Sequence, residues 1–170
     1  FFLTQFFGAF NDNVFKNALF ILIAFQSSYA GSTDSTNIIN LAAILFITPY
    51  LLFSSIAGQI ADRYEKSSLI RHIKLIEIFI MFVAAFGFYF KNIPLLLFTL
   101  FLMGTQSSVF GPIKYSIIPQ HLKRNELIGG NALVETTTFG AILLGTMLGG
   151  ILIGLSAGAK LFVPFAIVIL

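Results

Sequence analysis

The sequence predicts an all-α membrane protein, and three observations support this fold class. Hydrophobic residues make up 57% of the 170 residues and charged residues only 10%, whereas soluble proteins carry about 25% charged residues. The mean hydropathy of the chain is +0.93. The apolar residues also lie in long runs, and a helix needs about 20 such residues to cross the hydrocarbon core of a bilayer.

Five apolar segments and the beginning of a sixth are expected to be membrane-spanning helices. The second is the clearest, because residues 38–61 contain no Asp, Glu, Lys or Arg. Pro49 and Pro112 interrupt their segments, which is tolerated when neighbouring helices satisfy the freed backbone groups. In order, the expected spans are approximately residues 2–28, 38–61, 70–90, 94–115, 128–155 and 161 onward. Residue 1 is not Met, no signal peptide is visible, and the last span is still apolar at residue 170, so we expect a fragment cut at both ends.

The connectors between these spans predict the topology. Seven of the ten Lys and Arg residues lie in or beside the connectors that follow the second and fourth spans. Because short loops rich in Lys and Arg stay on the cytoplasmic side, we expect loops 62–69 and 116–127 and the N-terminus to be cytoplasmic, and loop 29–37 to be outside. The net charge of +3 therefore reflects topology, and we expect no nucleic-acid partner.

Several kinds of chemistry are not indicated by the sequence. The absence of cysteine excludes disulfides and thiolate metal sites. His72 and His121 lie in basic loops with no second ligand nearby. No nucleophile–base pair, phosphate-binding loop or metal-ligand spacing is present. We therefore expect neither an enzyme nor a bound metal or cofactor.

The fifth span is rich in glycine, which indicates close helix packing. Gly145 and Gly149 form a G-x-x-x-G pair, a spacing that lets two helix backbones approach closely within the membrane. We expect this pair to pack against another helix.

The first span carries a polar stripe that is costly in a membrane. Gln5, Asp12 and Lys16 lie within roughly a 100° arc of a helix, with Asn13 and Asn17 beside them. A charged residue at mid-span costs about 2.5–3.5 kcal/mol, so the stripe should face protein or water. Asp12 and Lys16 are i,i+4 neighbours and are expected to pair. Such a pair could be purely structural, but the additional Asn and Gln residues favour a binding site.

Charged residues in later spans add candidates. Glu135 in the fifth span is a candidate binding residue or a structural partner of Lys16 or Lys114, the latter at the end of the fourth span. Glu77 lies one turn from Lys74 near the basic end of the third span, where local pairing is sufficient to explain it.

The turn between the second and third spans carries a short glycine- and charge-containing motif. Gly58-x-x-x-Asp62-Arg63 is followed by Lys66, with Glu65 in place of a second glycine. This turn resembles the loop between helices 2 and 3 of the major facilitator superfamily. The resemblance implies a twelve-helix transporter working by alternating access, with residues 1–170 as its N-terminal six-helix half, truncated in helix 6. It further implies a conformational switch formed by Gly58, Asp62, Arg63 and Lys66. Within this switch, Asp62 and Arg63 would latch the two halves together.

Two further blocks resemble bacterial lysophospholipid transporters. They are Phe2-Leu-Thr-Gln-Phe-Phe-Gly-Ala-Phe-Asn-Asp-Asn-Val-Phe-Lys-Asn-Ala-Leu19, and Phe110-Gly-Pro-Ile-Lys-Tyr-Ser-Ile-Ile-Pro-Gln-His-Leu122 continued by Glu126-Leu-Ile-Gly-Gly-Asn-Ala-Leu-Val-Glu135. This resemblance implies transport of lysophospholipids, notably lysophosphatidylethanolamine, across the bacterial inner membrane. Its implied partners are the substrate, membrane lipids, the missing C-terminal half, and a fused or separate acyltransferase.

A head group with a phosphate and an ammonium needs both an anion and a cation in one cavity. For lysophosphatidylethanolamine we expect Lys16 to bind the phosphate and Asp12 the ammonium. Asn13, Asn17 and Gln5 would serve as neutral donors and acceptors. Glu135 is the second candidate for the ammonium and Lys114 the second candidate for the phosphate.

Two alternatives remain open from the sequence. The chain could belong to a proton-coupled transporter of another small amphiphile or drug, with Asp12 or Glu135 as the protonated group. It could also be a membrane anchor for a fused acyltransferase, although an anchor has no need of charges that are costly to bury.

Overall fold

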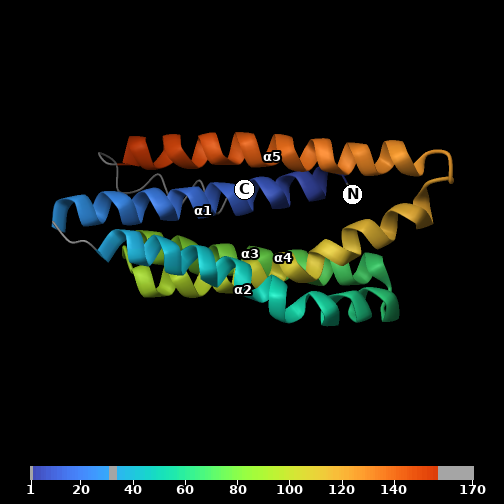
Figure 1. Ribbon diagram of the computed structural model, residues 1–170, viewed down its shortest axis with the longest axis horizontal. Coiled ribbons are helices and arrows are strands. Elements are labelled where there is room, and N and C mark those ends of the chain that lie inside the picture. The colour runs from blue at the N-terminus through green and yellow to red at the C-terminus, as the bar shows by residue number, and fades with distance from the viewer. Residues whose placement is uncertain (1, 31–33, 157–170) are drawn as a thin grey trace.

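The computed structural model describes residues 2–30 and 34–156, and these residues form five long α-helices (Figure 1). The fold is all-helical over this part of the chain. The helices are α1 (Phe2–Ala30), α2 (Asp34–Arg63), α3 (Lys66–Tyr89), α4 (Ile93–His121) and α5 (Leu127–Ser156). The expected sixth span and Lys160 lie outside the described residues, as does part of loop 29–37.

The two tight turns around α3 are defined by capping side chains. Glu65 is the N-cap of α3, and its carboxylate accepts hydrogen bonds from the backbone N–H groups of Ser67 at 3.1 Å and Ser68 at 2.8 Å. Asn92 caps α4 in the same way, accepting from Leu95 N at 3.1 Å. Such caps satisfy the N–H groups that a helix leaves free at its start. Glu65, which departs from the family pattern, therefore has a structural role of its own.

The helices form two layers. In Figure 1, α1 runs beside α5, and α4 runs beside α2 and α3, in agreement with the contacts between these helices. The charged connectors α2–α3 and α4–α5 lie at the same end of the molecule, and α1 begins at that end. The predicted clustering of Arg63, Lys66, Lys123 and Arg124 at one end is thus confirmed, while the membrane side that this end faces stays a prediction.

Glycines allow the closest helix approaches, as the G-x-x-x-G spacing predicts. A Cβ atom at Gly145 would lie 2.6 Å from Phe10 O of α1, and a Cβ atom at Gly149 would lie 2.7 Å from Val14 O. On the other layer, a Cβ atom at Gly104 of α4 would lie 2.5 Å from Phe46 O of α2. The absence of side chains at these positions sets the α1–α5 and α2–α4 distances.

The outer surface is apolar, and the main core joins the two layers. Fully buried side chains of this core include Phe15 and Leu19 of α1 and Leu96, Leu100 and Met103 of α4. Many large apolar side chains of α2, α3 and α5 point outward and remain exposed, as expected for a lipid-facing surface. Three helices are long and apolar enough over their described residues to cross a membrane: Thr36–Arg63, Ile93–His121 and Leu127–Leu155. The six-helix half itself stays a prediction.

Candidate head-group site

A cavity of about 440 Å³ with both charged and apolar lining residues lies between the two layers, and all five helices contribute to its wall. Its volume lies within the usual range of small-molecule pockets, about 300–1,000 Å³. The charged residues of its wall are Asp12, Lys16, Lys74, Glu77 and Lys114. A cavity with both signs of charge among apolar helices can hold a polar or zwitterionic group that the membrane itself would exclude.

Asp12 on α1 has one oxygen in a hydrogen bond and one without a partner. Ser107 on α4 donates its hydroxyl hydrogen to Asp12 Oδ2 at 2.6 Å. Oδ1 is buried and has no hydrogen-bond partner among the described residues. Since a buried polar atom is costly unless it is paired, this oxygen is suited to a ligand that brings a donor or a positive charge.

The prediction that Asp12 and Lys16 form an ion pair is wrong. In the ranges 2–30 and 34–156, the salt bridge present joins Lys74 and Glu77 instead. Lys16 Nζ lies 5.0 Å from the ring centroid of Phe46 on α2, where the negative face of the ring attracts a cation. The anion and the cation of α1 therefore both line the cavity without neutralising each other by direct contact.

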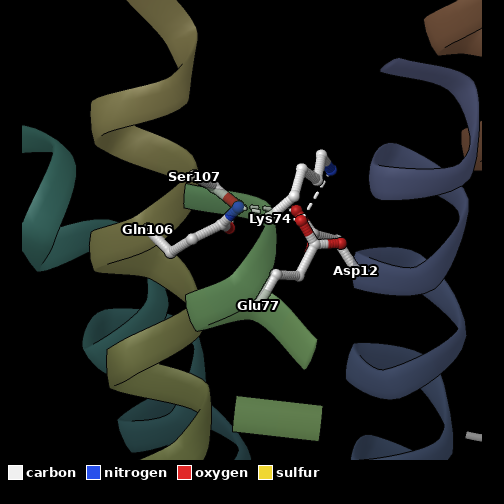
Figure 2. A network of polar contacts seen from close by, with 5 residues as sticks. All are labelled: Asp12, Lys74, Glu77, Gln106 and Ser107. Carbon is white, nitrogen blue, oxygen red and sulfur yellow. Dashed lines mark hydrogen bonds and ion pairs between the residues drawn. The ribbon is translucent and has the colours of Figure 1, made fainter. Parts of the chain in front are cut away.

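The Lys74–Glu77 pair belongs to a network that leads to Asp12 (Figure 2). Lys74 Nζ lies 2.6 Å from Glu77 Oε2, which also accepts a hydrogen bond from Gln106 Nε2 at 2.9 Å. The hydroxyl of Ser107 lies 3.1 Å from Gln106 Oε1 as well as 2.6 Å from Asp12. Local pairing of Glu77 was predicted and is confirmed, but its place in the cavity wall was not predicted.

Gln5 and Asn13 line the cavity, whereas Asn17 does not. Gln5 Nε2 donates to Thr138 Oγ1 of α5 at 2.7 Å. Asn13 Nδ2 is used within its own helix, where it donates to Ala9 O at 2.7 Å. Asn17 Nδ2 donates to Asn13 O at 2.8 Å and to Thr146 Oγ1 of α5 at 3.2 Å. Asn17 thus joins α1 to α5 in this structure.

Lys114 lines the cavity, but Glu135 lies outside its wall. The Nζ atom of Lys114 lies 4.7 Å from the ring centroid of the neighbouring Tyr115. The hydroxyl of Tyr115 donates a hydrogen bond to Glu135 Oε1. Glu135 therefore joins α5 to α4 through a tyrosine.

The structure gathers five of the seven predicted binding residues around one cavity: Gln5, Asp12, Asn13, Lys16 and Lys114. It adds Lys74, Glu77, Gln106 and Ser107 as a connected polar group. Lys74 and Glu77 could have been identified by the cost of two charged side chains within a predicted span. No comparable sequence signal distinguishes Gln106, because a single Gln in an apolar segment has many possible contacts.

The predicted switch turn lies at the charged end of the molecule, away from the cavity wall. Asp62 and Arg63 are exposed at the end of α2, and Lys66 begins α3. A Cβ atom at Gly58 would have no atom within 4 Å, so this face of α2 is open. The structure describes the turn, and its role as a latch stays a prediction.

The chemistry of the cavity wall is that of binding by charge and hydrogen bonds. Among the residues that the structure describes, no three His, Asp or Glu side chains form a group that could hold a metal ion. The wall offers three ammonium groups, two carboxylates and several amides.

Comparison with known protein families adds independent information. The sequence profile described as Major Facilitator Superfamily matches residues 1–170. Among similar curated proteins is the lysophospholipid transporter LplT of Cronobacter sakazakii, which is 29% identical over 159 residues, 94% of this chain and 37% of the relative. The protein of the same name from Enterobacter sp. strain 638 is 30% identical over 148 residues, 87% of this chain and 34% of the relative.

The lysophospholipid transporter LplT of Escherichia coli K12/DH10B is 29% identical over 150 residues, which is 88% of this chain and 35% of that protein. The chain thus spans about a third of the length of these curated relatives. No solved structure matches the chain significantly.

Proposed function

This chain belongs to the major facilitator superfamily, and we propose that it forms part of a transporter that moves lysophospholipids across the bacterial inner membrane by alternating access. The proposed substrate is lysophosphatidylethanolamine, and residues 1–170 would supply the N-terminal half of its pathway. A C-terminal half would complete the transporter, and an acyltransferase, fused or separate, would use the delivered lipid. The relatives named as lysophospholipid transporters support this substrate class.

One structural observation carries the proposal. A single cavity presents an unpaired carboxylate oxygen on Asp12 together with Lys16 and Lys114, whose ammonium groups lie over aromatic rings rather than on carboxylates. An ammonium group has three donors for the carboxylate, and a phosphate has acceptors for the lysines. A zwitterionic head group therefore supplies partners for charges that have no ion pair within the described residues.

The cavity size suits the head group better than the whole lipid. About 440 Å³ leaves the acyl chain to lie along the apolar outer surface of the helices, where its hydrocarbon contacts lipid. The two lysines flank Asp12 along the cavity, so the phosphate can meet a cation on either side of the bound ammonium.

The test compares two head groups in the full-length transporter, reconstituted in proteoliposomes. Asp12→Ala should reduce uptake of lysophosphatidylethanolamine at least tenfold, because truncating one partner of a buried charge pair costs about 2–5 kcal/mol. Uptake of lysophosphatidylglycerol, which has no ammonium, should fall less. Replacement by Ala of the lysine that binds the phosphate, either Lys16 or Lys114, should reduce uptake of both lipids at least tenfold. Glu135→Ala is expected to reduce uptake of both lipids at least tenfold through loss of the contact with Tyr115.

Glu126→Gln is the matched control, because Glu126 is an exposed carboxylate in the α4–α5 connector. This variant should transport both lipids normally. An equal loss for both lipids in Asp12→Ala would instead indicate a structural or proton-coupling carboxylate. That outcome favours the alternative of a proton-coupled transporter for another amphiphile.

A further inference from the structure

Gln5 lines the cavity and carries a second buried acceptor that has no hydrogen-bond partner in the part of the chain that the structure describes. The residue is only 3% exposed, and its Oε1 atom is buried without a hydrogen-bond partner among the described residues. Its Nε2 atom is used, donating to Thr138 Oγ1 at 2.7 Å. One half of this amide is therefore held by α5, and the other half has no hydrogen-bond partner in residues 2–30 and 34–156.

The orientation of the Gln5 amide follows from the hydrogen bonds of Thr138. The hydroxyl of Thr138 donates to Val134 O at 2.7 Å, and a hydroxyl group has only one hydrogen to donate. Thr138 Oγ1 can then only accept a hydrogen bond, so it must face the NH₂ group of Gln5. Because the reversed amide would place two acceptors together, the free atom of Gln5 is the carbonyl oxygen.

Gln5 and Asp12 place two unpaired acceptors on one face of α1. They are seven residues apart, which corresponds to about 10 Å along the helix axis, and both line the cavity. Gly8 lies between them, and Lys74 Nζ occupies the space that a side chain at position 8 would need. Along this face the groups therefore follow in the order Gln5 acceptor, Lys74 ammonium and Asp12 acceptor.

Lys114 adds a second ammonium on the Gln5 side. α4 runs antiparallel to α1 (Figure 1), and the contact between Ser107 and Asp12 aligns the two helices at that level. Lys114 is seven residues beyond Ser107, again about 10 Å along the axis. Lys114 is therefore level with Gln5, whereas Lys16 lies one turn beyond Asp12 in the opposite direction.

A lysophospholipid head group has a matching order of groups. Its ammonium is followed by the phosphate and then by a glycerol whose free hydroxyl marks the missing acyl chain. About eight single bonds separate the ammonium nitrogen from this hydroxyl oxygen, a reach of roughly 10 Å when extended. This reach is similar to the spacing of Asp12 and Gln5.

We propose that Gln5 Oε1 accepts a hydrogen bond from the free glycerol hydroxyl, and that Gln5 thereby selects one-chain over two-chain phospholipids. The inference rests on the proposed function and fixes the direction of the bound head group. With the ammonium on Asp12, the phosphate lies toward Lys74 and Lys114 rather than toward Lys16. A lipid that lacks the hydroxyl leaves Gln5 Oε1 buried and unpaired, which is how a polar site rejects an analogue without the matching donor.

The experiment measures uptake of two ligands by the full-length transporter in proteoliposomes. One ligand is lysophosphatidylethanolamine, and the other is its deoxy analogue, with a CH₂ group in place of the glycerol CHOH. The native protein should prefer the hydroxylated lipid at least tenfold. Gln5→Met keeps the length of the side chain but removes the acceptor. In this variant the ratio of uptake of the hydroxylated lipid to uptake of the deoxy analogue should be close to one.

Two threonine variants on α5 form a matched pair. Thr138→Val removes the group that orients Gln5 and should reduce the preference severalfold. Thr136→Val is the control, because the Thr136 hydroxyl is bonded within its own helix to Ala132 O at 2.8 Å and Thr136 is exposed outside the cavity wall. This control should keep the native preference.

The outcomes separate this inference from the proposed function. Equal uptake of the two lipids by the native protein overturns the role of Gln5 while leaving lysophospholipid transport intact. That comparison changes only the ligand, so it holds even if Gln5→Met does not fold. A native preference that persists in folded Gln5→Met also overturns the inference, and the absence of uptake of either lipid overturns both proposals.

Discussion

The hydroxyl of Ser107 on α4 donates a 2.6 Å hydrogen bond to Oδ2 of Asp12 on α1, and this bond orients the carboxylate within the cavity. Because Oδ2 is held, the other oxygen remains the free acceptor. The position of Asp12 thus depends on a helix far from it in sequence. The same bond joins the two layers of the fold beside the candidate head-group site.

Ser107→Ala should therefore weaken binding of lysophosphatidylethanolamine by about tenfold, since a hydrogen bond to a charged group contributes about 1.5–3 kcal/mol. Ser107→Thr retains the hydroxyl and should restore most of the affinity. The dissociation constants of the purified full-length variants provide the measurement. Native affinity in Ser107→Ala would show that Asp12 needs no such orientation.

Gly149→Ala should destabilise the protein by about 1–3 kcal/mol, the usual effect of overpacking. The added Cβ atom would lie 2.7 Å from Val14 O, an atom of the α1 backbone that cannot move aside locally. Gly154→Ala on the same helix is the control, because no atom lies within 4 Å of its Cβ position. Thermal unfolding in detergent should separate the two variants, and equal melting temperatures would contradict this account of the α1–α5 contact.

Asp62→Asn should slow transport while leaving substrate affinity nearly unchanged. Asp62 lies twelve residues beyond Tyr50, the cavity residue nearest to it on α2, or about 18 Å along the helix. A latch at this distance acts on the exchange between states rather than on binding. The measurement compares the turnover number of the variant with its dissociation constant for the substrate. A variant that no longer binds substrate but exchanges between its conformational states at the native rate would exclude the latch role.

The topology predicts that cysteines at Thr36 and Ser67 react with an impermeant reagent from opposite sides of the membrane. Both residues are exposed, and they lie near opposite ends of the molecule. Residues 1–170 contain no cysteine that would add background labelling. Ser67 should react from the cytoplasmic side, and labelling of both positions from one side would contradict the predicted orientation.

The sequence predicts the helices and the polar stripe of α1 because both depend on local patterns. Apolar runs of sufficient length define the spans, and the cost of burying Asp12 and Lys16 requires a polar environment. The close packing of Gly149 against another helix also follows from a short motif, although the motif does not say which helix. These features change little with the details of how helices rotate against one another.

The partners within the cavity could not be predicted in the same way. The i,i+4 spacing favours an Asp12–Lys16 pair, but the rotation of α4 brings Ser107 to Asp12, and Phe46 of α2 lies under Lys16. The rotation of α3 likewise turns the Lys74–Glu77 pair inward rather than toward the surface. These are long-range relations set by the packing of whole helices.

Two side-chain hydrogen bonds that cross between the layers, from Ser107 to Asp12 and from Tyr115 to Glu135, both end on carboxylates. Hydrogen bonds to an ionised acceptor are roughly twice as strong as those to a neutral one, so a neutral side chain in place of either carboxylate would hold the hydroxyl donor less firmly. Ser107 has an alternative acceptor in Gln106 Oε1 at 3.1 Å, so its hydrogen can leave Asp12 without becoming unpaired. The attachment of the two layers therefore depends on the charges of Asp12 and Glu135, and replacing either carboxylate by a neutral side chain would loosen the contact between the helices that enclose the cavity.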